Sequence, residues 1–169
     1  STGHLIVTGS LLNFNDDRGK LFLIVIQSAA ILAVMWEYRA RIAKVTRGMF
    51  SESSAQRFII NVFIAFLPLA ILGLIFGEYI KSELFNAHTV AITSIVGAFF
   101  ILWAEKRKHT VAVETVDDLT WKDSLKLGLA QALALIPGMS RSGATIIGGL
   151  FFGLSRKAAT EFTFFLAMP

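Results

Sequence analysis

Cysteine is absent from this chain of 169 residues, which excludes a disulfide framework and a thiolate metal site. Charged residues are also scarce, at 17% against the about 25% of an ordinary soluble domain. Hydrophobic residues make up 54% of the chain instead. This composition predicts an all-α polytopic membrane protein, because a helix satisfies its own backbone hydrogen bonds in lipid.

The net charge of +4 does not indicate a nucleic-acid partner, because the basic residues lie beside apolar segments and mark topology instead. The segments 37–57 and 105–110 are basic and are expected in the cytoplasm. The segment 77–88 lacks a basic excess and is expected outside. This orientation brings Ser1–His4 and Ser140–Thr145 to the same, outward-facing side.

Several apolar runs approach the length needed to cross a bilayer, and others are short or broken. We expect one transmembrane domain over 1–169, in a fragment that lacks N-terminal and C-terminal helices. We predict spanning helices at 21–36, 58–76 and 89–104, a first re-entrant motif at 1–19, a broken re-entrant helix pair at 124–154 and a truncated helix at 158–169. Pro68 should kink the second spanning helix.

The most informative stretch runs from Ile136 to Thr145 and interrupts an apolar region with a proline, two glycines, three hydroxyls and an arginine. Pro137 cannot continue a helix and disfavours the helical conformation of Ile136. The hydroxyl residues that follow suit the start of a new helix. Free N–H groups at a helix start, hydroxyls and the planar fork of Arg141 together predict an oxyanion site, above all for phosphate. The alternative is a helix–turn–helix with a snorkelling arginine, which is disfavoured because such an arginine is costly without a partner.

The two ends of the chain show a weak internal repeat. With a shift of 140 residues, Thr2-Gly3 falls on Ser142-Gly143 and Gly9 falls on Gly149. Each copy has a small polar loop, a half-helix with glycine, a polar turn and a longer helix. Broken helices in corresponding halves favour a bundle of inverted repeats with a site at their interface. Small residues that recur only for helix packing are the alternative.

Three motifs indicate a family: Ser-Thr-Gly-His at 1–4, Pro-Gly-Met-Ser-Arg-Ser-Gly-Ala-Thr at 137–145 and Ser-Arg-Lys-Ala-Ala-Thr-Glu-Phe at 155–162. Over its whole length the chain resembles the undecaprenyl-diphosphate phosphatase family, also called the bacitracin-resistance protein family. The resemblance implies removal of the terminal phosphate from a C55 polyprenyl diphosphate, at the outer face of the bacterial plasma membrane. It also implies recycling of the carrier lipid for peptidoglycan synthesis and a requirement for a divalent cation, Mg²⁺ or Ca²⁺.

The resemblance also assigns roles to individual residues. Ser1 matches a serine proposed as nucleophile or phosphate ligand, His4 matches a general acid/base and Arg141 matches the diphosphate-binding arginine. The residues implied to surround the phosphate are Ser140, Ser142, Gly143 and Thr145. The metal ligands are unknown, because the family's glutamate-rich motif precedes the point where this chain begins, and a fragment without it can be inactive. The implied partners are the polyprenyl diphosphate, membrane lipids and, as an open option, a second copy of the chain.

Two other functions were weighed against hydrolysis. A polyprenyl-phosphate flippase or transporter could use the same inverted-repeat phosphate site without needing His4. The acid-phosphatase-like lipid phosphatases carry a histidine several residues after Ser-Arg, whereas Ile146 and Ile147 stand there in this chain, so that superfamily is rejected. Glu161, near the last motif, is expected to pair with Arg156 or Lys157.

Overall fold

The computed structural model describes residue 5, residues 8–9, 11–12 and 14, and residues 16–168. The predicted re-entrant motif at 1–19 lies largely outside these residues. The continuous part, 16–168, is built from helices and contains no β-strand, as the composition predicts. Its helical elements are α2 (Asp17–Glu37), α3 (Arg39–Gly48), α4 (Ser53–Tyr79), η1 (Ile80–Leu84), α5 (Ala87–Glu105), η2 (Val116–Asp118), α6 (Trp121–Ala132), η3 (Leu133–Leu135), α7 (Arg141–Phe151) and α8 (Arg156–Phe165).

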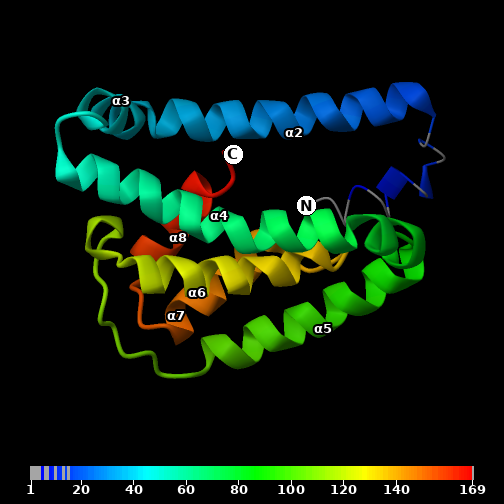
Figure 1. Cartoon of the computed structure of the whole chain (residues 1–169). Coiled ribbons are helices and arrows are strands. Elements are labelled where there is room, and N and C mark those ends of the chain that lie inside the picture. The colour runs from blue at the N-terminus through cyan, green and yellow to red at the C-terminus, as the bar shows by residue number, and fades with distance from the viewer. Residues whose placement is uncertain (1–4, 6–7, 10, 13, 15, 169) are drawn as a thin grey trace.

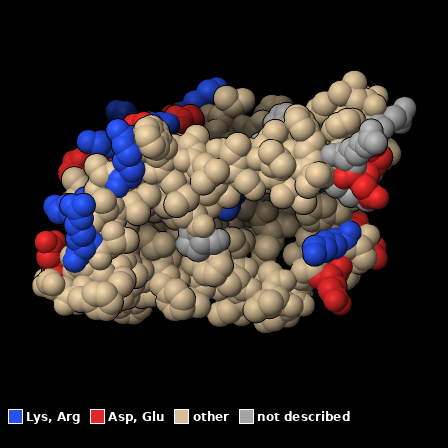
Figure 2. All heavy atoms as spheres, turned by 90° about the horizontal axis from the view of Figure 1, so that it is seen from above, with Lys and Arg blue, Asp and Glu red and all other residues tan. Residues whose placement is uncertain are grey.

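The helices run back and forth between two ends of an elongated bundle (Figure 1). α2 leads to the end that holds α3, α4 returns to the opposite end, and α5 runs back again. The basic segments 37–57 and 105–110 therefore lie at one end, which we call the basic end, and 77–88 lies at the other. Figure 2 shows Lys and Arg gathered at the basic end, while the middle of the face is almost free of charge. This grouping agrees with the predicted topology, although which end faces the cytoplasm stays a prediction.

Among the described residues, two helices are long and apolar enough to cross a membrane: α4 with its π-helical continuation η1, and α5. A third span is counted only if the bent pair formed by Leu21–Glu37 and Arg39–Gly48, which meet at 71°, crosses as one unit. The predicted spans at 58–76 and 89–104 are helices, each with longer ends, and their crossing of a membrane stays a prediction. The first predicted span, 21–36, is a helix, but it begins at Asp17, because Asp16 caps it through its side chain and Gly19 N–H. α4 runs unbroken through Pro68, which is buried.

The predicted broken pair at 124–154 is present, but its boundaries differ. α6 already begins at Trp121, because Thr120 and Asp123 form a reciprocal capping box. α7 ends at Phe151, since Gly153 adopts a positive φ of 86° and Leu154 pairs with Val113. The last helix begins two residues before the predicted 158 and ends at Phe165, with Ser155 as its cap.

The core lies where α4, α6, α7 and α8 meet. Leu127 of α6 and Phe162 of α8 are completely buried in it. Gly128 of α6 sits against the backbone of Ala65 of α4, so that even a methyl group there would meet the carbonyl of Ala65. Close backbone approach at small residues is how helices pack in membranes, and it holds α6 rigidly against α4.

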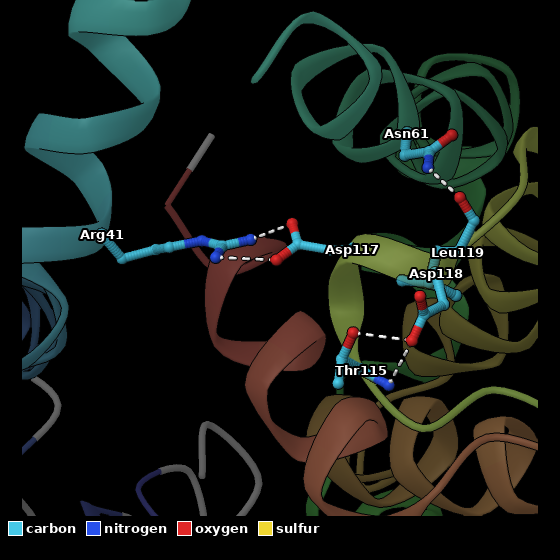
Figure 3. Close-up of polar contacts among 6 residues, drawn as sticks. All are labelled: Arg41, Asn61, Thr115, Asp117, Asp118 and Leu119. Carbon is cyan, nitrogen blue, oxygen red and sulfur yellow. Dashed lines mark hydrogen bonds and ion pairs between the residues drawn. The ribbon is translucent and has the colours of Figure 1, made fainter. Parts of the chain in front are cut away.

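A loop at the basic end is fastened to this core through its own polar groups (Figure 3). Arg41 of α3 forms a bidentate ion pair with Asp117 of η2. The buried Asn61 of α4 donates to the carbonyl of Leu119 at 2.7 Å. The loop that leads into α6 is therefore fixed, and so is the direction in which α6 approaches the break in the helix.

Candidate phosphate-binding site

The predicted interruption of the helix is present and begins after α6. The short 3₁₀ segment η3 ends at Leu135, and Ile136 has an extended backbone, as expected before a proline. Pro137 is followed by Gly138, whose φ of 95° is a conformation that L side chains rarely adopt. The backbone can therefore reverse within a few residues and start α7 at Arg141.

Two hydroxyl groups of α5 hold this turn in place. Thr93 Oγ1 donates to the carbonyl of Pro137 and also approaches the carbonyl of Thr89 of its own helix, at 2.8 Å. Ser94 Oγ donates to the carbonyl of Gly138 at 3.2 Å. A non-helical turn inside an apolar bundle needs partners for its carbonyl groups, and α5 supplies them.

The start of α7 presents hydrogen-bond donors. Ser140 caps the helix, because its Oγ accepts from the N–H of Gly143 at 3.1 Å. The Oγ atoms of Ser140 and Ser142 lie 3.2 Å apart. Within the described part of the chain, the backbone N–H groups of Arg141 and Ser142 have no acceptor. Two free N–H groups and two hydroxyls at a helix N-terminus form an arrangement that favours an anion.

These groups line a cavity of about 600 Å³ between α2, the turn and α8. Ser140, Arg141 and Ser142 form its main polar part, and Gln27 of α2 and Thr163 of α8 are further polar lining residues. Most of the remaining wall is apolar: Ala30, Ile31 and Val34 of α2, Leu69 of α4, Phe85, Phe164 of α8, and Ala167 and Met168 after the end of α8. A cavity with a polar patch and long apolar walls is suited to an amphiphile with an anionic head.

Arg141 is the only charged side chain that lines this cavity among the described residues. No carboxylate of the described chain lies within ion-pair distance of its guanidinium group. By contrast, Arg156 is paired with Glu105 through hydrogen bonds of 2.8 and 2.6 Å. An exposed arginine that lacks a counter-ion among the described residues is available for a bound anion.

Gln131, the penultimate residue of α6, is a second polar group without a partner among the described residues. Its side chain is completely buried, and neither its amide nitrogen nor its amide oxygen has a hydrogen-bond partner in the part of the chain that the structure describes. Such a group has a desolvation cost that no contact in the structure offsets. Gln131 does not line the cavity, so it is a feature of the surrounding core.

Some of the predicted site residues lie outside the described residues, and others are described but do not line the cavity. Ser1 and His4 lie outside the described residues. Gly143 contributes its N–H to the cap of Ser140, and Thr145 is fully buried and donates to the carbonyl of Arg141 at 2.8 Å. Neither of these two lines the cavity, and their phosphate-binding role stays a prediction.

The sequence analysis missed several residues of the site. Thr93 and Ser94 look like ordinary polar positions in a spanning helix, and only the fold shows that they contact a turn 44 residues away. Gln27, the polar residue of α2 that lines the cavity, donates only weakly to the carbonyl of Leu23, at 3.3 Å. A pattern of 27, 30, 31 and 34 on one helical face is the signal that could have placed it there.

The predicted pairing of Glu161 with Arg156 is wrong. Arg156 pairs with Glu105 at the end of α5, a residue 51 positions away that helix periodicity cannot reveal. No metal is assigned to the described residues either, because they contain no group of three or more His, Asp or Glu that could hold an ion. The divalent cation therefore stays a prediction that depends on other residues.

Comparison with known proteins gives a consistent result. The sequence profile of the family described as "Bacitracin resistance protein BacA" matches residues 1–169. A protein of Dechloromonas aromatica named "Undecaprenyl-diphosphatase" is 72% identical over the whole chain, and proteins of the same name from Nitrosospira multiformis and Nitrosomonas europaea are 64% and 62% identical. The chain covers 62% of the length of each of these three relatives.

Proposed function

Because this chain belongs to the bacitracin resistance protein BacA family, we propose that the protein hydrolyses undecaprenyl diphosphate to undecaprenyl phosphate and inorganic phosphate. The reaction adds water across the phosphoanhydride bond and leaves the monophosphate on the lipid. It would recycle the carrier lipid for peptidoglycan synthesis and confer resistance to bacitracin. Relatives that share 62–72% of the residues carry the name of this activity.

One observation supports this function most directly: the unpaired Arg141 lies at the polar part of a cavity whose other walls are apolar. The diphosphate would lie against Ser140, Arg141 and Ser142, and the first isoprene units would lie along α2 and α8. Arg141 would contact two phosphate oxygens through its planar fork, and the free N–H groups of the helix start would add donors. Phosphoryl transfer depends mainly on such positioning and charge stabilisation.

The remaining chemistry is assigned by proposal to residues that the structure does not describe. Ser1 would act as nucleophile or phosphate ligand, and His4 would exchange the proton as general acid and base. A divalent cation, Mg²⁺ or Ca²⁺, would neutralise charge on the phosphoryl oxygens when bound. The walls of the described cavity contain no carboxylate, so its residues are given no role in holding the cation.

The setting of the reaction is also a proposal. The predicted topology directs the turn at Pro137 and the segment 77–88 toward the outside of the bacterial plasma membrane. The partners would be the polyprenyl diphosphate and the surrounding membrane lipids. A homodimer is a further option, which the mass of the purified protein in detergent would test.

The decisive experiment replaces Arg141 in the full-length protein. Arg141→Lys keeps the charge but removes the planar fork, so phosphate release from undecaprenyl diphosphate should fall on the order of 10²–10³-fold, the usual cost of one preorganised donor. His4→Ala should also reduce release, while binding of the lipid diphosphate stays largely intact. Both variants are purified and assayed for phosphate release and for lipid binding. Arg39→Lys, at the exposed start of α3, is the matched control and should release phosphate at the normal rate.

The outcomes distinguish the functions that this site could have. Undiminished release by Arg141→Lys would remove Arg141 from the catalytic assignment. Weaker lipid binding by Arg141→Lys, together with little effect of His4→Ala, would favour a transport site instead. Unchanged binding and unchanged release would mean that Arg141 only supports the fold.

A further inference from the structure

A second hollow lies at the basic end of the molecule, where α5 and α7 terminate. Its volume is about 420 Å³, within the usual range for sites that bind small ligands. α7 is 11 residues long, so the hollow lies roughly 15 Å along the helix axis from Arg141, at a rise of about 1.5 Å per residue. It is lined by Trp103, Arg107, Lys108, His109, Thr110, Leu150 and Phe151.

The basic side chains of this hollow are not neutralised by the protein. The ion pairs among the described residues join Arg41 to Asp117, Lys126 to Asp123 and Arg156 to Glu105. Arg107 and Lys108 take part in none of them. The nearby carboxylate, Glu105, is already occupied by its bidentate pair with Arg156. Two free cations beside the Thr110 hydroxyl therefore leave this hollow positively charged.

The wall of the hollow is aromatic and continues onto an exposed aromatic surface. The rings of Trp103 and Phe151 lie 5.8 Å apart, and Phe100 contacts both, at 5.6 and 6.3 Å. Each of these three side chains is 44–47% exposed. The guanidinium of Arg107 lies 4.6 Å above the Trp103 ring, which fixes the charge at the border between the aromatic surface and the polar end.

The position of this hollow matches the headgroup level of a bilayer. A tryptophan at the end of a spanning helix is typical of the membrane interface, and α5 is one of the two helices long enough to span. Basic pockets between helices at that level bind anionic lipid headgroups. A free phosphate ion would use the cations but would leave the exposed aromatic surface without a partner.

We propose that this hollow binds the phosphodiester headgroup of an anionic phospholipid. Arg107, Lys108 and Thr110 contact the phosphate, and the acyl chains lie against Phe100, Trp103 and Phe151. The site is separate from the diphosphate site at Arg141 and does not depend on the proposed hydrolysis. Its effect would be to anchor the ends of α5 and α7 at one leaflet, while the start of α7 and Thr93 and Ser94 of α5 lie at the turn.

The test uses Trp103 as a reporter in the full-length protein, with every other tryptophan replaced by phenylalanine. The protein is reconstituted in phosphatidylcholine vesicles that contain either brominated phosphatidylglycerol or brominated phosphatidylcholine, which quench nearby tryptophan. Phosphatidylglycerol should quench Trp103 several-fold more effectively at equal mole fraction. Arg107→Gln and Lys108→Gln should each weaken this preference roughly fivefold, which corresponds to the about 1 kcal/mol that one basic residue contributes near an anionic surface.

The matched control is Trp36, near the end of α2, which also lies at the basic end. Arg39 lies over its ring at 4.7 Å, but Trp36 lines neither of the two cavities described here. A protein with Trp36 as its only tryptophan should show the weaker preference that general surface charge produces. Inorganic phosphate in the buffer should leave the preference at Trp103 unchanged, because it cannot replace the acyl contacts.

Three results would overturn the proposal. The first is equal quenching of Trp103 by the two lipids, and the second is an equal preference at Trp103 and Trp36. The third is complete loss of the preference in the presence of inorganic phosphate, which would mean that the hollow recognises a free ion. Circular dichroism of each variant checks that the helices are intact.

Discussion

At the basic end, the polar side chains that fix the loops are paired with other groups of the protein, whereas polar side chains at the turn at Pro137 are left unpaired. At the basic end, Arg41 is paired with Asp117, Asn61 with the carbonyl of Leu119 and Arg156 with Glu105. At the turn, backbone carbonyls are held by α5, but the guanidinium of Arg141 and the amide of Gln131 have no partner in the described chain. Two departures from this rule lie at the basic end: Arg41 Nε is buried and unpaired, and Arg107 and Lys108 form no ion pair among the described residues.

This difference separates scaffold from site. Polar pairs that close on one another fix the loop before α6 and the start of α8, and they have little left to offer a ligand. Unpaired donors in an apolar bundle cost free energy, so a structure that keeps them favours a bound anion over the empty state. The predictions below test whether the turn is as rigid as its carbonyl contacts indicate, and whether the pairs at the basic end contribute as little to function as this comparison implies.

The largest effect is expected at Gly138. Gly138→Ala must hold a φ of 95°, and its new methyl group would lie against Thr93 Oγ1 and 2.6 Å from the carbonyl of Val90. The strained conformation alone costs about 1–3 kcal/mol. The turn should therefore shift, and phosphate release by the full-length protein should fall roughly 100-fold, because a displacement of about 1 Å can have that effect.

The control for this variant is Gly77→Ala, since Gly77 lies in α4 with no atom within 4 Å of the new methyl group. It should retain normal phosphate release and normal stability. If Gly138→Ala were as active as Gly77→Ala, the turn would be adaptable and the carbonyl contacts of α5 would not determine the position of Arg141.

A smaller effect is expected at Thr93. Thr93→Val keeps the shape but leaves the carbonyl of Pro137 without its donor, so phosphate release should fall about tenfold, the effect of roughly 1.4 kcal/mol on the barrier. Thr93→Ser keeps the hydroxyl and should restore most of the rate. Thr89→Val, one helical turn earlier, is the matched control and should change little.

The kinetic constants separate positioning from folding in this series. If Thr93 orients the turn, Thr93→Val should lower kcat while its circular dichroism and thermal unfolding stay close to those of Thr89→Val. A parallel loss of helix content and activity would instead assign Thr93 to general packing.

The turn and its contacts with α5 show which features of the site the sequence could predict and which it could not. The break at Pro137, the cap at Ser140 and the isolated charge of Arg141 depend on local rules, and the sequence predicted all three. The partners Thr93 and Ser94 depend on the register between α5 and the turn, which no local pattern specifies. The same limit explains the wrong partner for Arg156, because a helix offers neighbours at i±3 and i±4 while Glu105 belongs to another helix.

The prediction of the helix boundaries from the sequence was limited in a similar way. Apolar runs predicted the helices at 21–36 and from 124, but their polar starts were missed, because capping by Asp16 and by Thr120 extends a helix into residues that hydropathy assigns to loops. The cavity itself required α2 and α8 to face each other across the turn, and that arrangement follows from packing of the whole bundle.

A stabilising effect is expected at Gln131. Gln131→Met keeps the side-chain shape and removes two polar atoms that are buried without partners, so the free energy of unfolding should rise by about 1 kcal/mol. Unfolding in a mixed-detergent titration of the full-length protein would measure this. A loss of stability would show that the amide is hydrogen-bonded in the membrane, which would weaken the contrast between the two regions.

The smallest effect concerns the pair of Arg41 and Asp117. The hydrogen bonds from Arg41 hold the pKa of the Asp117 carboxyl below its ordinary value, so the pair stabilises the fold above that value, and the contribution is lost as the pH falls through the lowered pKa. Half of the Asp117 side chain is exposed, and the contribution should not exceed about 1 kcal/mol. At neutral pH, Asp117→Asn should unfold slightly more easily than the unmodified protein, and below about pH 4 the difference should shrink toward zero.

A double-mutant cycle with Arg41→Gln isolates the pair from the packing of Arg41 on Phe58, whose ring lies 5.1 Å away. Phosphate release at neutral pH should be unchanged in Asp117→Asn, and a clear loss of activity would mean that the basic end and the turn are coupled.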